Sequence, residues 1–257
     1  MSHLHIPDGV LPPIVWIAGL VLALFGVALS AIATRGVGPQ RIAFQSALGG
    51  LMLAVMAIPV PITAFDYCMT LAGPVGVLLG AASAFQVSFV VTVILALMGQ
   101  GGFTVIGLNA LVLGIGAMTA RPLYLWLAAR MRRPLAMAFA TAISQLVSSA
   151  LWLAVLAISV RLSPVAAADE EVNHTIRWLQ GGALVALLAP LLLVAVSVES
   201  LLGYGLAQFL DRVRPDLLPG AGTPGPQGGH DGSGSGTPGS PGSPGVQGGA
   251  GGAKRLG

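Results

Sequence analysis

Two histidines near the first residue of the chain could bind a metal ion. The chain starts Met1-Ser2-His3-Leu4-His5. A terminal amine, the backbone amides behind it and an imidazole can surround a small divalent ion in a nearly flat arrangement of nitrogen atoms. Square-planar nitrogen coordination suits Ni²⁺ and Cu²⁺, and Co²⁺ less strictly. The opening residues therefore predict a site for a transition metal.

The residues that follow predict a stiff turn just before the membrane. Pro7 restricts φ, Gly9 permits positive φ, and the Asp8 carboxylate can accept hydrogen bonds from nearby backbone N–H groups. A frayed terminus that merely carries two polar residues would not need this stiffness. We therefore favour the metal-binding interpretation of His3 and His5 over that simpler one.

A second group of candidates surrounds the single cysteine of the chain. Cys68 follows Asp66 and precedes an apolar segment that begins near Leu71. A lone cysteine in an apolar protein is commonly a small buried hydrophobic residue, whereas a thiolate outside the membrane can bind a metal, and the sequence leaves both open. Asp66 fits either a partner of a metal-bound imidazole or a solvated loop charge, and we favour the loop charge.

Further polar groups lie in apolar surroundings. Asn109 ends a glycine-rich turn that opens a helix, so its side chain either caps that helix or holds a ligand loop in place. Glu199 lies within the last apolar segment, where a carboxylate either marks a functional site or pairs with an arginine near the inner surface. Interhelical hydrogen bonds are expected of four residues: Gln45, Gln86, Ser144 and Gln145.

The composition predicts that membrane-spanning helices position these groups. Of 257 residues, 55% are hydrophobic and 8% are charged, against about 25% charged in a soluble domain. The first apolar segment is a retained helix rather than a signal peptide, because the residues ahead of it carry no Lys or Arg. The apolar segments cover about 13–34, 41–59, 71–99, 105–130 (interrupted at Arg121-Pro122), 134–160 and 177–212.

The segment 71–99 is too long for one helix across a hydrocarbon core of about 30 Å. Dividing it into two short or re-entrant segments places every arginine cluster on the cytoplasmic side. We therefore predict an all-α polytopic membrane protein with about seven transmembrane segments, the third and fourth short or broken, the N-terminus outside and the C-terminus cytoplasmic. A broken helix is tolerated where it lines a cavity, which points to a pocket beside Cys68.

Three parts of the chain are predicted to differ in role. Residues 1–12 form an extracytoplasmic metal-binding terminus, residues 13–218 the transmembrane domain, and residues 219–257 a disordered cytoplasmic tail rich in Gly, Pro and Ser. The net charge of +3 comes from arginines at helix ends, and does not indicate nucleic-acid binding. The chain holds no HExxH, Cys-x-x-Cys, Gly-x-Ser-x-Gly or Walker A sequence, so no enzyme is predicted.

Three segments carry a family resemblance. Residues 5–11 read His-Ile-Pro-Asp-Gly-Val-Leu, residues 101–109 end in Gly-Leu-Asn, and residues 199–218 close the last helix. They resemble the N-terminal signature, the Gly-Gly-x-Thr-x-x-Gly-x-Asn segment and the final helix of the CbiM/NikM group. These proteins are the cobalt/nickel substrate-capture (S) components of energy-coupling factor (ECF) transporters. The resemblance covers about residues 3–218.

The resemblance implies a multi-pass protein of the cell membrane that takes up Co²⁺ or Ni²⁺ and carries no prosthetic group. The ion is held by the terminal amine, the next backbone amide, the signature histidine and a second histidine in the loop before the third helix. The implied partners are a transmembrane coupling subunit and cytoplasmic ATPase subunits, often with a small accessory membrane subunit, in addition to membrane lipid.

The chain departs from the family pattern at two places. His5 matches the signature histidine, with four residues in front of it. Removal of Met1 would leave Ser2-His3 as the terminal chelating unit, so either histidine, or both, could ligate. Cys68 stands where the second histidine is expected, which fits a softer ligand, an altered ion preference or a partly disabled site. A membrane metal sensor or scaffold that no longer transports is therefore the alternative function.

Overall fold

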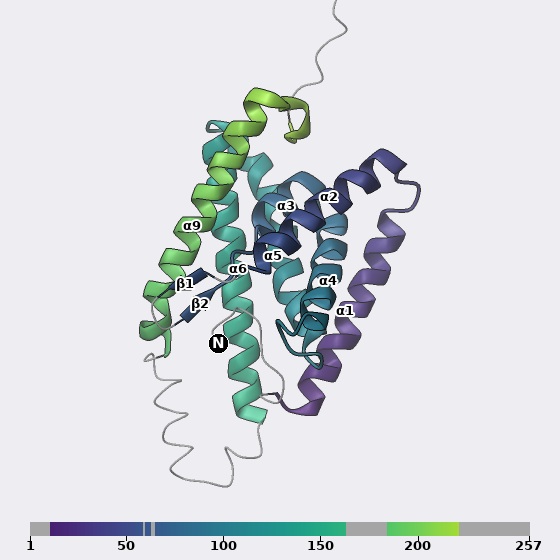
Figure 1. The fold of residues 1–257 in the computed structure, drawn as a ribbon, viewed down its shortest axis with the longest axis vertical. Coiled ribbons are helices and arrows are strands. Elements are labelled where there is room, and N and C mark those ends of the chain that lie inside the picture. Colours follow the sequence, from purple (N-terminus) through teal and green to yellow (C-terminus); the bar gives the residue numbers. More distant parts are fainter. Residues whose placement is uncertain (1–10, 59, 63–64, 163–183, 221–257) are drawn as a thin grey trace, which may run out of the picture. The chain divides into compact units, whose positions relative to one another are not determined.

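The computed structural model describes residues 11–58, 60–62, 65–162 and 184–220 (Figure 1). The predicted N-terminal turn and the predicted tail from residue 221 lie outside these residues. The elements in the described ranges are α1 (Pro13–Ala33), α2 (Pro39–Met56), β1 (Val60–Ile62), β2 (Phe65–Tyr67), α3 (Ala72–Leu79), α4 (Ala81–Leu97), α5 (Ile106–Ala128), α6 (Arg133–Leu162), α9 (Leu184–Val213) and the 3-10 turn η2 (Pro215–Leu217).

Each apolar segment of the sequence forms a helix, and the segment 71–99 forms two. The predicted division is confirmed at Gly80, where φ is 81° and ψ is 170°. A Cβ atom at this position would lie 2.8 Å from Nη1 of Arg121, so both the backbone conformation and the space favour glycine. The short α3 has 8 residues and is about 12 Å long, which is less than half of a hydrocarbon core.

Four helices of the described ranges are long and apolar enough to cross a membrane. They are α1, α5, α6 over Arg133–Ser159 and α9 over Ala189–Val213, while α4 is apolar but shorter. This finding establishes a helical membrane protein. The number of crossings and the orientation of the termini stay predictions.

Two features of the fold differ from the sequence-based expectation. The interruption predicted at Arg121-Pro122 is wrong, because α5 continues through Pro122 to Ala128. Proline is tolerated within membrane helices where neighbouring helices support the backbone, and α5 contacts α1, α3, α4 and α6. The hairpin of β1 and β2, with Val60 opposite Tyr67, was also not expected, because three-residue strands carry too little pattern to recognise.

The helices approach one another closely where glycine lies in the interface. A Cβ atom at Gly76 of α3 would collide with the backbone carbonyl of Ala117 in α5, and one at Gly116 would collide with the hydroxyl of Ser148 in α6. Small residues at contacts are the usual means by which membrane helices pack, because lipid offers no hydrophobic driving force between them. These contacts hold α3, α5 and α6 together.

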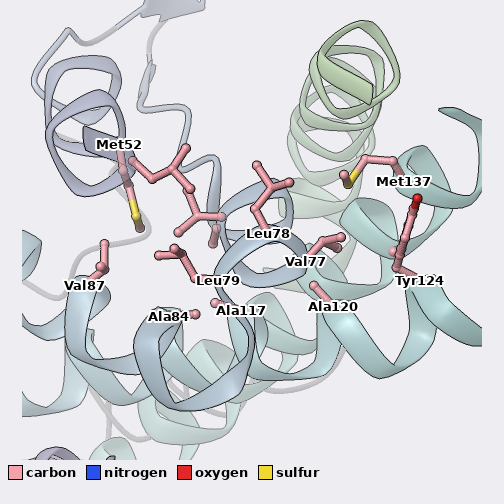
Figure 2. Packing of buried hydrophobic residues seen from close by; sticks show 14 of the residues in the cluster. Met52, Val77, Leu78, Leu79, Ala84, Val87, Ala117, Ala120, Tyr124 and Met137 are labelled. Carbon is pink, nitrogen blue, oxygen red and sulfur yellow. The ribbon is translucent and has the colours of Figure 1, made fainter. Parts of the chain in front are cut away.

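The main apolar cluster surrounds α3. Figure 2 shows Leu79 of α3 on the side of Met52 and Val87, and Val77 on the side of Tyr124 and Met137. Met52, Val77, Tyr124 and Met137 are fully buried. The cluster therefore anchors α3 against α2, α4, α5 and α6, and fixes the start of α3 where the candidate site lies.

Contacts between helix ends bring several arginines to one end of the bundle. Arg41 of α2 donates a hydrogen bond to the carbonyl of Leu79 at the end of α3, and Arg121 of α5 lies against Gly80. Arg133 at the start of α6 forms an ion pair with Asp211 near the end of α9, with 3.0 Å between the atoms. The same end includes further arginines: Arg35, Arg130, Arg132, Arg212 and Arg214.

Candidate metal-binding pocket

The segment between β2 and α3 brings polar groups into the bundle. Cys68 is buried, with 5% of its surface exposed, and Thr70 is buried with 2% exposed. Leu71 then adopts a φ of 52°, the one positive φ of a non-glycine residue in the described ranges. This uncommon conformation turns the chain into α3, and the Thr70 hydroxyl accepts a hydrogen bond from the N–H of Ala72 at 3.3 Å.

Glu199 of α9 is bound by Thr70. The N–H of Thr70 donates to Oε1 at 2.8 Å, and its hydroxyl lies 2.9 Å from Oε1 and 3.0 Å from Oε2. Glu199 is 1% exposed. It precedes Arg212 by 13 positions on the same helix, which at about 1.5 Å per residue is about 20 Å from the arginine-rich end. The carboxylate thus belongs to the interior of the bundle rather than to its charged end.

A small cavity adjoins these residues. It measures ≈ 10 Å³, which is room for about one water molecule. Thr70, Asn109, Gln145 and Ser148 supply its polar wall, and Met56 is among its apolar residues. The Thr70 hydroxyl lies 3.5 Å from Oε1 of Gln145. The Nε2 atom of Gln145 is buried and has no hydrogen-bond partner among the described residues.

Asn109 lies beyond the N-cap of α5. The helix α5 has Val105 at its N-cap, and no side chain caps it. Asn109 is the fourth residue of α5 rather than its N-cap, is 5% exposed and lines the cavity; its role in holding a ligand loop stays a prediction. The glycine turn that precedes α5 is confirmed by positive φ at Gly99 and Gly101.

The expected hydrogen bonds between helices are confirmed for Gln45, Gln86 and Ser144. Gln45 of α2 donates to Gln86 of α4 at 3.1 Å, and Ser144 of α6 donates to the carbonyl of Gly116 in α5 at 2.7 Å. Gln145 contacts Thr70, which also lines the cavity. Sequence reasoning did not single out Thr70 or Ser148, because a hydroxyl in an apolar segment carries no signal of its partner.

Most of the predicted metal ligands lie outside the described ranges. Met1, Ser2, His3 and His5 do so, together with their neighbour Asp8. Asp66 pairs with Pro61 in the hairpin, and its side chain is not described. In the part of the chain that the structure describes, no three His, Cys, Asp or Glu side chains gather around a common point. The roles of these residues as ligands stay predictions.

Leu11, the first residue that the structure describes, lies near the cavity. Leu11 is buried against Val105 and Leu108 at the beginning of α5, with Trp152 of α6 packed on the same cluster. Leu108 directly precedes Asn109 of the cavity wall. The described part of the chain therefore begins beside the pocket.

Apolar helices long enough to cross a bilayer, packed into one bundle, define a multi-pass α-helical membrane protein. Within this class, the chain belongs to the CbiM family. The family model described as the cobalt uptake substrate-specific transmembrane region matches residues 5–217. The family resemblance of the sequence, its membrane localisation and a role in transition-metal uptake are thereby confirmed, and a transporter component is not an enzyme class.

Solved structures share this fold. One is described as a truncated transition metal transporter, with a TM-score of 0.64 and 18% identity over 80% of this chain and 97% of that chain. Another is described as a transition metal transporter, with a TM-score of 0.64 and 19% identity over 81% of this chain and 93% of that chain. At these identities the likeness establishes the fold alone. The comparison with curated proteins gives no significant match.

Proposed function

We propose that this protein captures Co²⁺ or Ni²⁺ for an ATP-driven transporter of the energy-coupling factor type. The observation that carries the proposal is the family match over residues 5–217. The chain contains no ATP-binding motif, so the energy would come from cytoplasmic ATPase subunits through a transmembrane coupling subunit, with an accessory membrane subunit as a further partner.

The proposed orientation places the N-terminus outside and the C-terminus in the cytoplasm. Its support is the gathering of arginines at one end of the bundle, where α1, α5 and α9 finish and α2 and α6 begin. Lys and Arg are enriched in cytoplasmic loops of membrane proteins. The pocket around Thr70 would then open toward the outside, from which the ion arrives.

The proposed ligands are the terminal amine and backbone of Met1 or Ser2, the imidazoles of His3 and His5, and the thiolate of Cys68. Ten residues of extended chain reach at most about 36 Å, and this segment is attached at Leu11 beside the pocket. Asp8, Asp66 and Asn109 would support the ligands through hydrogen bonds.

The buried carboxylate of Glu199 favours a cation in the pocket. A charged carboxylate is costly in the low-dielectric interior of a membrane protein, and a nearby positive charge reduces that cost. Thr70 already donates two hydrogen bonds to it. We propose that Glu199 offsets the charge of the captured ion from behind the cavity wall, rather than ligating it directly.

Titration calorimetry with Co²⁺ and Ni²⁺ tests the site. Adding one residue before Ser2, or replacing His3 and His5 with Ala, should abolish high-affinity binding, and Cys68→Ala should weaken it. His230→Ala, in the segment from residue 221, is the matched control and should bind as the wild type does. Unchanged affinity in the terminal variants would overturn the ligand assignment.

Metal accumulation tests the transport function itself. Cells that express this protein with its coupling and ATPase subunits should accumulate Co²⁺ or Ni²⁺, and the double histidine variant should not. Binding without accumulation in the complete assembly would favour the alternative, a membrane metal sensor or scaffold of the same fold.

A further inference from the structure

A second cavity lies at the arginine-rich end of the bundle. It measures ≈ 330 Å³ and is lined by the end of α1, the start of α2, the α3–α4 break and α5. Arg41 and Arg121 both line it, and so do Thr34 and Ser83. Its volume is within the range of about 300–1,000 Å³ typical of small-molecule sites.

The charge of this cavity favours an anion. Its lining includes two guanidinium groups and no Asp or Glu. The ion pairs found in the described ranges are Arg133 with Asp211 and Arg214 with Asp216, so neither Arg41 nor Arg121 is neutralised there. Arg41 donates one weak hydrogen bond, of 3.4 Å, to the carbonyl of Leu79. A guanidinium has five N–H donors, so most of them remain for an anion.

Backbone and hydroxyl donors add to this charge. The N–H of Ala84 donates the first hydrogen bond of α4, to the carbonyl of Gly80 at 2.9 Å. The N–H groups that precede Ala84 in the helix therefore have no partner within it and can bind an anion. Ser83 is 2% exposed and lines the cavity, so its hydroxyl is a further hydrogen-bond donor there. Gly80 itself allows Arg121 to approach this helix end.

An apolar groove continues from the cavity along the same helices. It measures ≈ 620 Å³, is lined by α1, α2 and α4, and its lining is mostly aliphatic. Gln45 of the groove follows Arg41 of the cavity by four positions, and Val87 follows Ser83 by four, which is about one helical turn toward the membrane interior. Gln86 donates to Thr34 at 2.9 Å, so a polar contact joins the two spaces.

We propose that the cavity and the groove together bind one anionic phospholipid. The phosphate lies between Arg41 and Arg121 at the start of α4, and one acyl chain lies in the groove between α1, α2 and α4. Basic pockets between transmembrane helices commonly take anionic lipid headgroups. A free phosphate would satisfy the arginines equally well, but the groove that leads from them into the membrane fits a lipid and has no use for a free ion.

Native mass spectrometry of the full chain in detergent tests the lipid, with phosphatidylglycerol and phosphatidylcholine of equal chain length as probes. The wild type should prefer phosphatidylglycerol by about 30-fold, the ratio expected from two arginines at the membrane surface. The double variant Arg41→Gln with Arg121→Gln should lose this preference. Arg212→Gln removes one exposed arginine from the same end without touching the cavity, and it should keep the preference.

Gly50→Leu tests the acyl chain. Gly50 lines the groove, and a Cβ atom there meets nothing within 4 Å, so the leucine fills the groove without disturbing the fold. The substitution should weaken the binding of long-chain phosphatidylglycerol but not the binding of the dihexanoyl form, whose acyl chains are short. The control Gly205→Leu changes a similarly open glycine of α9 and should leave both unchanged.

Three outcomes would overturn the proposal. Equal binding of the two lipids by the wild type would exclude a headgroup site, and so would a preference that survives the double arginine variant. Arginine-dependent binding of inorganic phosphate without any lipid preference would identify a free-anion site instead. Metal affinity and thermal unfolding of each variant, measured alongside, should match the wild type and so separate lipid binding from folding and from metal capture.

Discussion

Replacing Thr70 with valine should destabilise the protein through Glu199. Valine keeps the shape of threonine but removes the hydroxyl that lies 2.9 Å and 3.0 Å from the two carboxylate oxygens. A hydrogen bond to a charged group contributes about 1.5–3 kcal/mol to stability. The backbone N–H of Thr70 still donates to Oε1 at 2.8 Å, so the carboxylate keeps part of its support. We expect a loss of about 2 kcal/mol in the free energy of unfolding.

The matched control is Thr92→Val. Thr92 is buried to a similar degree, but its hydroxyl donates to the nearby carbonyl of Phe89 at 2.8 Å within its own helix. The loss of one neutral local hydrogen bond should cost about 1 kcal/mol or less. Thr70→Ser keeps the hydroxyl and should stay near the wild type.

A double-mutant cycle with Glu199→Gln isolates the pair. In the neutral glutamine background the Thr70 hydroxyl donates to an uncharged acceptor, so its removal should cost only about 0.5–1.5 kcal/mol. Equilibrium unfolding in mixed detergent measures each variant. Equal losses for Thr70→Val and Thr92→Val, or no coupling in the cycle, would refute the prediction that the Thr70 hydroxyl stabilises an ionised Glu199.

Further predictions concern the backbone, the metal and the C-terminal segment. Gly80→Ala should destabilise by about 1–3 kcal/mol, because φ is 81° and a Cβ atom would meet a guanidinium; unfolding in detergent measures it. Gly76→Ala should prevent the packing of α3 on α5, whereas Gly205→Ala, in open space, should be neutral or stabilising by about 1 kcal/mol; the yield of folded protein on a sizing column separates the two. Metal affinity should fall as the pH is lowered through about 6.5, the ordinary pKa of histidine, since imidazole and amine must lose protons to bind. Calorimetry across that pH range measures it, and an affinity that does not change with pH would contradict the prediction. Deletion of residues 221–257 should leave metal affinity and unfolding unchanged, because the family match ends at residue 217.

Hydropathy and charge sufficed to predict the helices. The helix α1 begins at Pro13 as expected, and the division of the segment 71–99 followed from its length and from the positions of arginines. These are properties of single segments in a bilayer, so they can be read from a local stretch of sequence. The continuation of α5 through Pro122 could not be predicted from a local stretch of sequence, because the effect of a proline depends on the helices that pack around it.

The polar interior was predictable only in part. Glu199 could be selected because a carboxylate is rare in an apolar helix, but its partner Thr70 is 129 residues away. The sequence does not encode such a pairing as a local pattern, and it arises from the packing of α9 against the rest of the bundle. Asn109 was selected from its glycine-rich turn; it is buried and is not the N-cap residue of α5, and its role in holding a ligand loop stays a prediction. His3 and His5 lie outside the described ranges, so their role as metal ligands stays a prediction.

The glycine contacts among α3, α5 and α6 restrict how an ion could pass through this protein. At Gly76 the nearest atoms of α5 are all backbone atoms of Ala117, and at Gly116 the nearest atom of α6 is the short hydroxyl of Ser148, so little side chain separates these helices. Such a contact keeps the two helices in a fixed relative position and does not allow one to rotate or slide against the other. We therefore expect no channel to open between these helices during a transport cycle. The helices α3, α5 and α6 should instead move together as one rigid unit.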